Sequence, residues 1–107
     1  MIKSEEGFIT AILTQAVEDA RYIGSNKYMI KQKFESITWI MSNDPQFNYY
    51  CKLINIEPSY IQNKIKRYSE VKFTKEQKIL VKPIVAKILE SKKYQDNWFA
   101  KYVEERI

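Results

Sequence analysis

An all-α fold with five to six helices is predicted by three features of this 107-residue chain. Apolar residues recur every three or four positions through most of the sequence, which is the spacing of a helix with one buried face. Turn-forming residues interrupt this spacing at intervals, and no alternating pattern is long enough for a sheet. Hydrophobic residues make up 45% of the chain and glycine occurs only twice, so we expect a single helical domain over residues 1–107.

The first two helices are expected over residues 4–23 and 27–41, separated by the turn-forming sequence Gly24-Ser25-Asn26. The apolar positions of the first are Phe8, Ile9, Ile12, Leu13, Ala16, Val17 and Ala20. Those of the second are Ile30, Phe34, Ile37, Trp39, Ile40 and Met41. Asp44 then has the side chain of an N-cap, and Pro45 suits the first position of a third helix.

A helix-turn-helix is predicted at residues 45–68, where nearly every position has a suitable residue type. Its first helix ends near Ile54, and Cys51 supplies a small apolar side chain where the two helices must approach closely. Asn55 lies at the turn, where a positive φ is usual and asparagine is tolerated. Pro58 offers the fixed φ of a first helical turn, so the second helix is expected to begin there.

A C-terminal helical extension is expected over residues 74–107. Thr74 and Gln77 have the spacing of a capping box, which predicts that a helix begins near residue 75. Its apolar face consists of Leu80, Val81, Ile84, Val85, Ile88 and Leu89, and Pro83 is a point where it can kink. A last helix is expected from about residue 96, with Trp98, Phe99, Tyr102 and Val103 on its apolar side.

The second helix of the predicted motif has a polar outer face that suits DNA. Ile61, Ile65 and Tyr68 are expected to point inward. The predicted base-contacting residues are Ser59, Gln62, Asn63 and Lys66, whose side chains can bond to base edges in the major groove. The alternative is that this face is an ordinary solvated surface. Tyr49 and Tyr60 lie beside the inward face, where a phenol can reach a phosphate or cover the edge of the core.

Positive charge is concentrated in the second half of the chain. Residues 1–25 carry two basic and four acidic groups, whereas residues 64–93 carry ten basic and three acidic groups. Such asymmetry suits a polyanionic partner. The predicted phosphate-contacting residues are Lys52, Lys64, Arg67, Lys72, Lys75 and Lys78. Two other interpretations are a lysine-rich solvated surface, and a basic helix over residues 75–93 that lies on an anionic membrane or docks on a protein.

Several classes of activity are excluded by composition. The absence of histidine excludes a histidine base or metal ligand, and one cysteine cannot form a zinc-thiolate site or an internal disulfide. Gly7 and Gly24 are isolated, so no phosphate-binding glycine loop can form. We therefore expect no enzymatic activity, no metal and no cofactor. No secretory signal opens the sequence and no apolar stretch is long enough to span a bilayer, which predicts a cytoplasmic protein with no membrane contact.

A resemblance to small helical proteins of bacteriophages and prophages is carried by residues 39–47, followed by Cys51, Ile56-Glu57-Pro58 and Ile61. In those proteins a tryptophan, a Ser-Asn/Asp-Asp turn, a phenylalanine, a cysteine and a late proline recur at similar spacing. The resemblance covers about residues 16–68 and does not extend to the C-terminal part. It implies a bacterial, phage-derived helix-turn-helix protein.

These observations together predict a sequence-specific, double-stranded DNA-binding regulator of transcription, associated with the nucleoid when bound. One recognition helix contacts only a few base pairs, so a homodimer is expected. The predicted dimer interface consists of the C-terminal helices, at residues 80–89 and 98–103. One alternative is a protein-binding adaptor that docks, for example, on RNA polymerase. Another is a small phage structural protein.

Overall fold

The computed structural model describes residues 3–90, and over these residues the chain is entirely helical apart from turns. The elements are α1 (Lys3–Ala20), α2 (Lys27–Met41), α3 (Pro45–Leu53), α4 (Pro58–Arg67), the short 3-10 helix η1 (Ser69–Val71) and α5 (Lys75–Glu90). No strand occurs in this part of the chain, so the all-α prediction is confirmed. The helix expected from about residue 96 lies outside the described residues.

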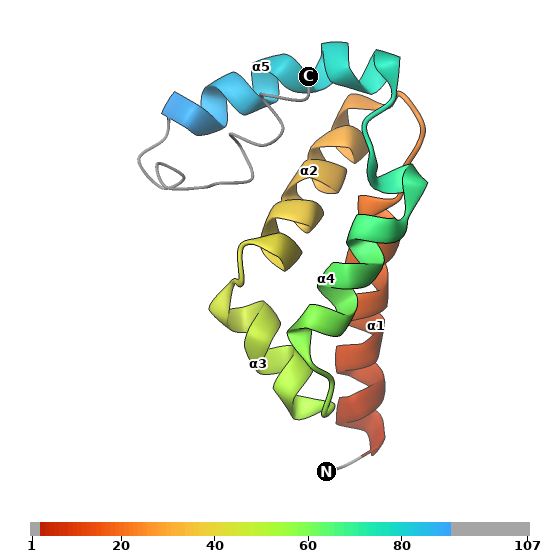
Figure 1. Ribbon diagram of the computed structural model, residues 1–107, viewed down its shortest axis with the longest axis vertical. Helices are drawn as coiled ribbons and strands as arrows, with labels where there is room; N and C mark the ends of the chain where they lie inside the picture. The colour runs from red at the N-terminus through yellow and green to blue at the C-terminus, as the bar shows by residue number, and fades with distance from the viewer. Residues whose placement is uncertain (1–2, 91–107) are drawn as a thin grey trace.

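The five α-helices of residues 3–90 form a bundle with α5 across one end (Figure 1). α1 and α2 pack against each other and run in opposite directions, and α4 runs in the same direction as α1 in this view. α3 links the lower end of α2 to the start of α4, and α5 lies across the upper end of α2. The chain between α4 and α5 therefore passes along the same end of the molecule as the loop between α1 and α2.

The starts of the helices are set by local side chains, as the sequence indicated. Asp44 caps α3, since its Oδ1 accepts a hydrogen bond from the Gln46 amide at 2.8 Å. Before α5, the Gln77 amide donates to Thr74 Oγ1 at 3.1 Å and the Thr74 amide donates to Gln77 Oε1 at 3.0 Å. These reciprocal bonds are the predicted capping box. At α2, the cap is Asn26.

Two asparagines adopt a left-handed backbone conformation at the ends of α3. Asn43 precedes it with φ of 57° and Asn55 follows it with φ of 59°. At Asn55 the chain reverses, and the Ile56 amide donates to the Cys51 carbonyl at 2.9 Å. The predicted positive φ at Asn55 is confirmed. Asparagine tolerates the left-handed region at both positions, whereas most other residues with a side chain avoid it.

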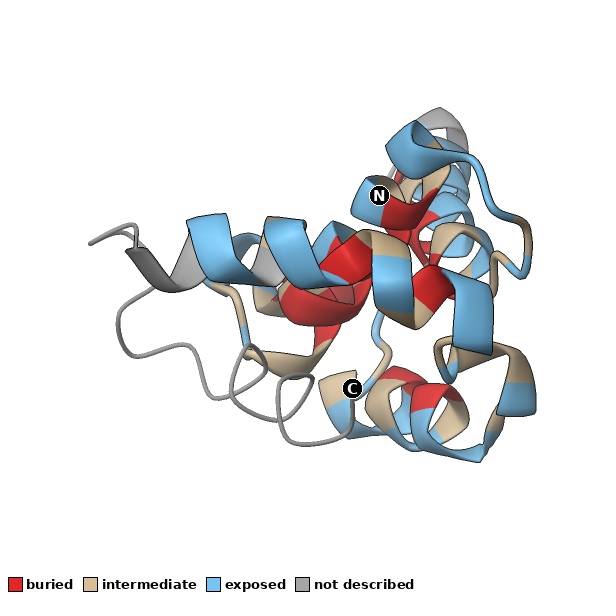
Figure 2. Ribbon diagram, turned by 90° about the horizontal axis from the view of Figure 1, so that it is seen from above, coloured by how far each residue is buried: buried red, intermediate tan, exposed pale blue. Residues whose placement is uncertain are grey.

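The core lies between the helices, and its apolar members come from each of them (Figure 2). The buried apolar residues are Ile9, Leu13, Ala16, Ala20, Ile30, Phe34, Ile37, Ile40, Phe47, Cys51, Ile61, Ile65 and Val81. Trp39 packs edge-on against Phe47, with ring centroids 5.3 Å apart. Cys51 is fully buried, and this desolvation raises the pKa of its thiol, so it is a poor nucleophile.

Two residues of the predicted apolar stripes lie elsewhere. Phe8 is 67% exposed, because Ile9 beside it occupies the inward position on α1 and neighbouring helical side chains diverge by about 100°. Tyr68 is half-buried rather than inward-pointing, and its ring lies beneath the guanidinium of Arg21 at 4.4 Å. The pattern of apolar residues had indicated helices correctly, but it could not decide which of two adjacent apolar side chains faces the core.

Candidate nucleic-acid interface

The outer face of α4 is centred on Asn63. Ile61 and Ile65 are the buried residues of this helix, and Asn63 lies opposite them. Around Asn63, four further side chains are exposed: Ser59, Tyr60, Lys66 and Arg67. Three of the four predicted base-contacting residues, Ser59, Asn63 and Lys66, are therefore free on one surface. Tyr60 and Arg67 belong to the same face.

Gln62 differs from its predicted position on this face. It is half-buried, and its Nε2 donates to the Ile40 carbonyl at 3.0 Å and to Asn43 Oδ1 at 2.8 Å. The physical reason is that Gln62 lies about 80° around the helix from the midline of Ile61 and Ile65, at the boundary of the buried face. Both amide hydrogens are engaged within the protein, so Gln62 joins α4 to the end of α2 and the turn before α3.

The predicted phosphate contacts occupy three places in the fold. Lys52 is exposed at the end of α3. Lys64 and Arg67 are on α4, where Lys64 Nζ lies 4.7 Å from the centroid of the Tyr60 ring and this contact raises the pKa of Lys64. Lys72 lies in the linker between α4 and α5, which consists of residues 68–74 and includes η1. Lys75 and Lys78 lie in the first turn of α5.

The cations between residues 64 and 82, here called the basic segment, are not neutralised by neighbouring carboxylates. The basic segment contains seven Lys and Arg residues and only two acidic ones, Glu70 and Glu76. Ion pairs in the described part of the chain are Arg21–Glu18, Arg21–Glu70 and Lys31–Glu35, none of which uses a cation of the basic segment. Its positive charge is therefore available to a partner.

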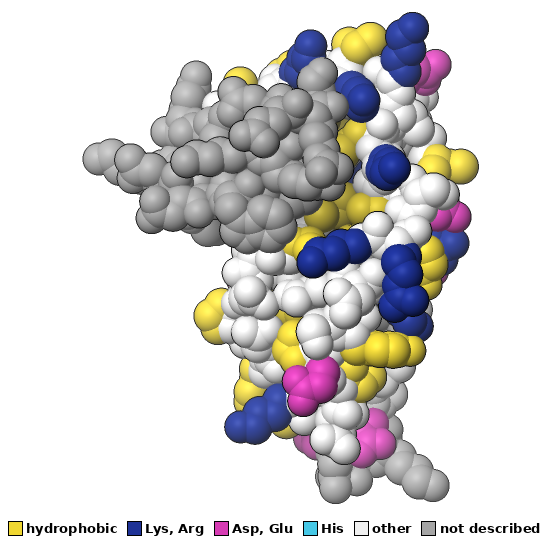
Figure 3. All heavy atoms as spheres, viewed as in Figure 1, with side chains coloured by type: hydrophobic (Ala, Val, Ile, Leu, Met, Phe, Trp, Pro, Cys, Tyr) yellow, Lys and Arg dark blue, Asp and Glu magenta, His cyan; other side chains and the backbone are white. Residues whose placement is uncertain are grey.

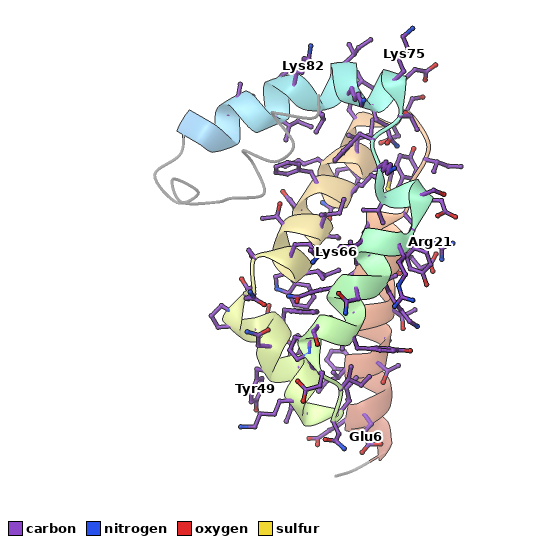
Figure 4. The ribbon with its side chains drawn as sticks, viewed as in Figure 1. Glu6, Arg21, Tyr49, Lys66, Lys75 and Lys82 are labelled. Carbon is purple, nitrogen blue, oxygen red and sulfur yellow. The ribbon has the colours of Figure 1, made fainter. Side chains whose placement is uncertain are left out.

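The space-filling view shows these cations on one side of the molecule (Figure 3). Lys and Arg side chains follow α4 upward to the start of α5, with a few acidic side chains beside them at the right edge and upper right, and further acidic side chains lie toward the lower end of the molecule. Figure 4 places Lys66 at the middle of this side, Lys75 and Lys82 on α5, and Glu6 at the opposite end. On this face, positive side chains therefore predominate along α4 and the start of α5.

The linker between α4 and α5 is held from the outside by Arg21, at the end of α1. Arg21 Nη2 lies 3.3 Å from Glu70 Oε1, and the guanidinium stacks on the Tyr68 ring. The pKa of Glu70 is lowered most by a hydrogen bond from its own backbone amide and next by the hydrogen bond from Arg21. The only acidic side chain of η1 is therefore turned toward Arg21.

The same linker is held from the inside by Lys33, a lysine with no exposed surface. Its Nζ donates to the carbonyls of Tyr22 at 2.8 Å, Glu70 at 2.9 Å and Lys72 at 3.0 Å, and to Gln77 Oε1 at 2.8 Å. Desolvation by burial lowers the pKa of Lys33 from 10.5 to about 8. No carboxylate of the described residues forms an ion pair with it.

The sequence analysis did not identify Lys33 as a residue of interest. One signal was present, because Lys33 lies three residues after Ile30 and directly before Phe34, on the apolar side of its helix. A lysine at such a position usually extends its head to water along the apolar surface. The oxygens that surround it come from residues up to 44 positions away, and no local pattern indicates them.

Large exposed aromatic residues also occur near α4. Tyr49 on α3 is 58% exposed and Tyr60 is 53% exposed. Tyr49 projects away from α4 on the side of α3 (Figure 4), so the two do not form one patch. None of the described helices is long and apolar enough to cross a bilayer, and the described residues contain no cluster suited to a metal ion.

No protein-family model, no curated protein and no solved structure matches this chain.

Proposed function

We propose that this protein binds double-stranded DNA through α4, with α3, the turn at Asn55 and α4 acting as a helix-turn-helix. The observation that carries the proposal is the outer face of α4, where exposed Ser59, Asn63, Lys66 and Arg67 adjoin the unpaired cations of the basic segment. Polar side chains that can read base edges, flanked by cations for phosphates, are what a recognition helix requires.

Each residue of this face has a role in the proposal. Asn63, at the centre, is suited to a bidentate contact with adenine, and Ser59 can bond to several base or phosphate groups. Lys66 and Arg67 reach guanine or phosphate. Gln62 has both amide hydrogens engaged within the protein, so we assign it to holding α4 in place rather than to reading a base.

The proposal includes a role as a bacterial, phage-related regulator of transcription. It also includes a homodimer as the form that binds DNA. The part of the expected interface on α5 is only partly free, because Val81 is buried in the core and Leu80 and Ile84 pack against it. Ile79, on the outer side of α5, is 66% exposed. The expected contribution of Trp98, Phe99, Tyr102 and Val103 lies outside the described residues.

The first test is fluorescence anisotropy with random-sequence duplex DNA at about 50 and about 200 mM salt, where phosphate-driven binding changes steeply. We expect salt-sensitive binding that Lys66→Ala/Arg67→Ala weakens. Its slope of log K against log salt should be smaller by about 2, since each phosphate contact contributes about 0.9. The matched control is Lys27→Ala/Lys31→Ala, which removes the same charge from exposed positions of α2.

Two outcomes would contradict the proposal. One is no binding at low salt by a folded protein, and the other is an equal loss of affinity in the control and test variants. If binding is confirmed, selection of a preferred site follows. With that site, Asn63→Ala should relax the preference at one base pair by about 1 to 3 kcal/mol.

A protein-binding adaptor is the second candidate, favoured by the exposure of Tyr49 and Tyr60, since aromatic residues are frequent anchors of protein interfaces. This candidate takes first place if the folded protein ignores DNA at low salt. Capture of RNA polymerase by the wild-type protein, lost in Tyr60→Ala, would support it. Binding to DNA by the α4 face would contradict it.

A further inference from the structure

The ammonium group of Lys33 is surrounded by four oxygens from three separate segments of the chain. The loop after α1 contributes the Tyr22 carbonyl, the linker contributes the carbonyls of Glu70 and Lys72, and α5 contributes Gln77 Oε1. All four lie between 2.8 and 3.0 Å from Nζ. The ring of Phe73 covers the group at 4.9 Å. We call these four oxygens the ammonium cage.

Gln77 fixes one side of the cage in a single orientation. Its Oε1 accepts from Lys33 and from the Thr74 amide, whereas its Nε2 donates to the carbonyls of Tyr22 at 2.9 Å and Gly24 at 2.8 Å. The first turn of α5 is thereby bonded to the loop after α1. Gln77 has no exposed surface, so these bonds are made away from water.

The cage oxygens need N–H donors to come together. Four oxygens that converge on one point without a donor would repel one another, and each would have lost its bond to water. A neutral side chain at position 33 cannot offer three donors at that point, whereas an ammonium group can. The linker and the start of α5 thus have a specific reason to dock only when the side chain at position 33 carries several N–H donors.

We propose that the ammonium cage is a site for a primary ammonium group, filled by Lys33, and that its occupancy holds the linker and α5 against the bundle. Lys33 is then a positioning residue for Lys72, Lys75 and Lys78. This last consequence rests on the proposed DNA-binding function, whereas the docking of α5 does not.

Amide hydrogen exchange on the full-length protein tests the docking. In Lys33→Met, which keeps most of the side-chain volume without charge, we expect residues 78–84 to lose protection by about tenfold or more while α1 and α2 keep theirs. Equal protection of α5 in Lys33→Met and wild type would overturn the proposal. Loss of protection throughout α1 and α2 would also overturn it, because the ammonium would then support the whole bundle.

Chemical rescue separates the charge from the space that Lys33 fills. Lys33→Ala removes the Cγ, Cδ and Cε atoms and the ammonium group, which together correspond to n-propylammonium. Added n-propylammonium should restore protection of residues 78–84, whereas n-propanol and tetramethylammonium at the same concentration should not. Rescue by n-propanol to the same extent, or no rescue by n-propylammonium, would show that the cage does not require an ammonium group.

The DNA assay is kept as a separate measurement. If Lys33→Met frees α5 and also lowers the salt slope of DNA binding, both the cage and its consequence are supported. If α5 is freed and DNA binding does not change, the docking proposal stands and the positioning of the three lysines is wrong. If the wild-type protein does not bind DNA, hydrogen exchange still decides the role of the cage.

Discussion

At the scale of single residues, Lys33 is the position where burial and charge oppose each other most directly. Moving an ammonium group out of water is costly unless its hydrogens are bonded, and here four oxygens accept them. The remaining cost appears in the pKa of Lys33, which burial lowers to about 8. A measurable dependence of stability on pH follows from this shift.

Between about pH 8 and 10.5, the unfolded chain still protonates Lys33 while the folded protein does not. The unfolded state then binds more protons at Lys33. The contribution of Lys33 to the free energy of unfolding therefore rises with pH in this window and does not change with pH below it. We expect the difference in unfolding free energy between wild type and Lys33→Met to grow by about 1 to 3 kcal/mol from neutral pH to about pH 10. Urea unfolding of both proteins measures it, and the comparison cancels the contributions that the two proteins share. A difference that does not change with pH would contradict the lowered pKa.

Residue-scale predictions from the sequence succeeded where the cause was local. The conformation of Asn55 and the burial of Cys51 follow from residue type and from the adjacent pattern, and both were predicted. The positions of Lys33 and Gln62 depend on partners at least 19 residues away, apart from the Tyr22 carbonyl. Such partners become neighbours only after the helices pack, so no local pattern could identify them.

At the scale of secondary-structure elements, the boundaries of α3 depend on two asparagines with nearly the same φ but different surroundings. Asn43 Oδ1 accepts the bond from Gln62, whereas no described hydrogen bond uses the Asn55 side chain. Glycine relieves the conformational cost at both positions. The two sites therefore distinguish backbone strain from side-chain bonding.

The matched substitutions Asn55→Gly and Asn43→Gly test this distinction. We expect Asn55→Gly to leave stability within about 0.5 kcal/mol of wild type, because the backbone conformation is retained. Asn43→Gly should cost about 1 kcal/mol more, since Gln62 loses an acceptor. Urea midpoints of the two variants give the comparison. Equal stability of both variants would mean that the bond from Gln62 contributes nothing.

The elements themselves were largely predictable, because their starts are fixed by nearest neighbours. Asp44, Pro45, Pro58 and the Thr74–Gln77 capping box set the beginnings of α3, α4 and α5 within the chain itself. The face that each helix buries was less predictable. On α4 the buried face is defined by Ile61 and Ile65, and Gln62 lies at the edge of that face.

At the scale of the whole molecule, the large apolar side chains exposed among the described residues include Ile79 and Phe8, which lie on different helices. Ile79 on α5 is 66% exposed and Phe8 on α1 is 67% exposed. If the proposed homodimer forms through α5, Ile79→Glu should weaken self-association at least about tenfold. Phe8→Glu carries the same change in charge and polarity and should have no effect. Sedimentation velocity measures the association, and a wild-type protein that stays monomeric at about 100 μM would contradict the dimer.

The ammonium cage also constrains the order in which the chain can assemble during synthesis. Lys33 is made early, but its last acceptor, Gln77, belongs to α5. The other three acceptors, the carbonyls of Tyr22, Glu70 and Lys72, precede α5 in the chain, so only the bond to Gln77 has to wait for that helix to be made. The attachment of α5 therefore completes the shell of oxygens around the ammonium group.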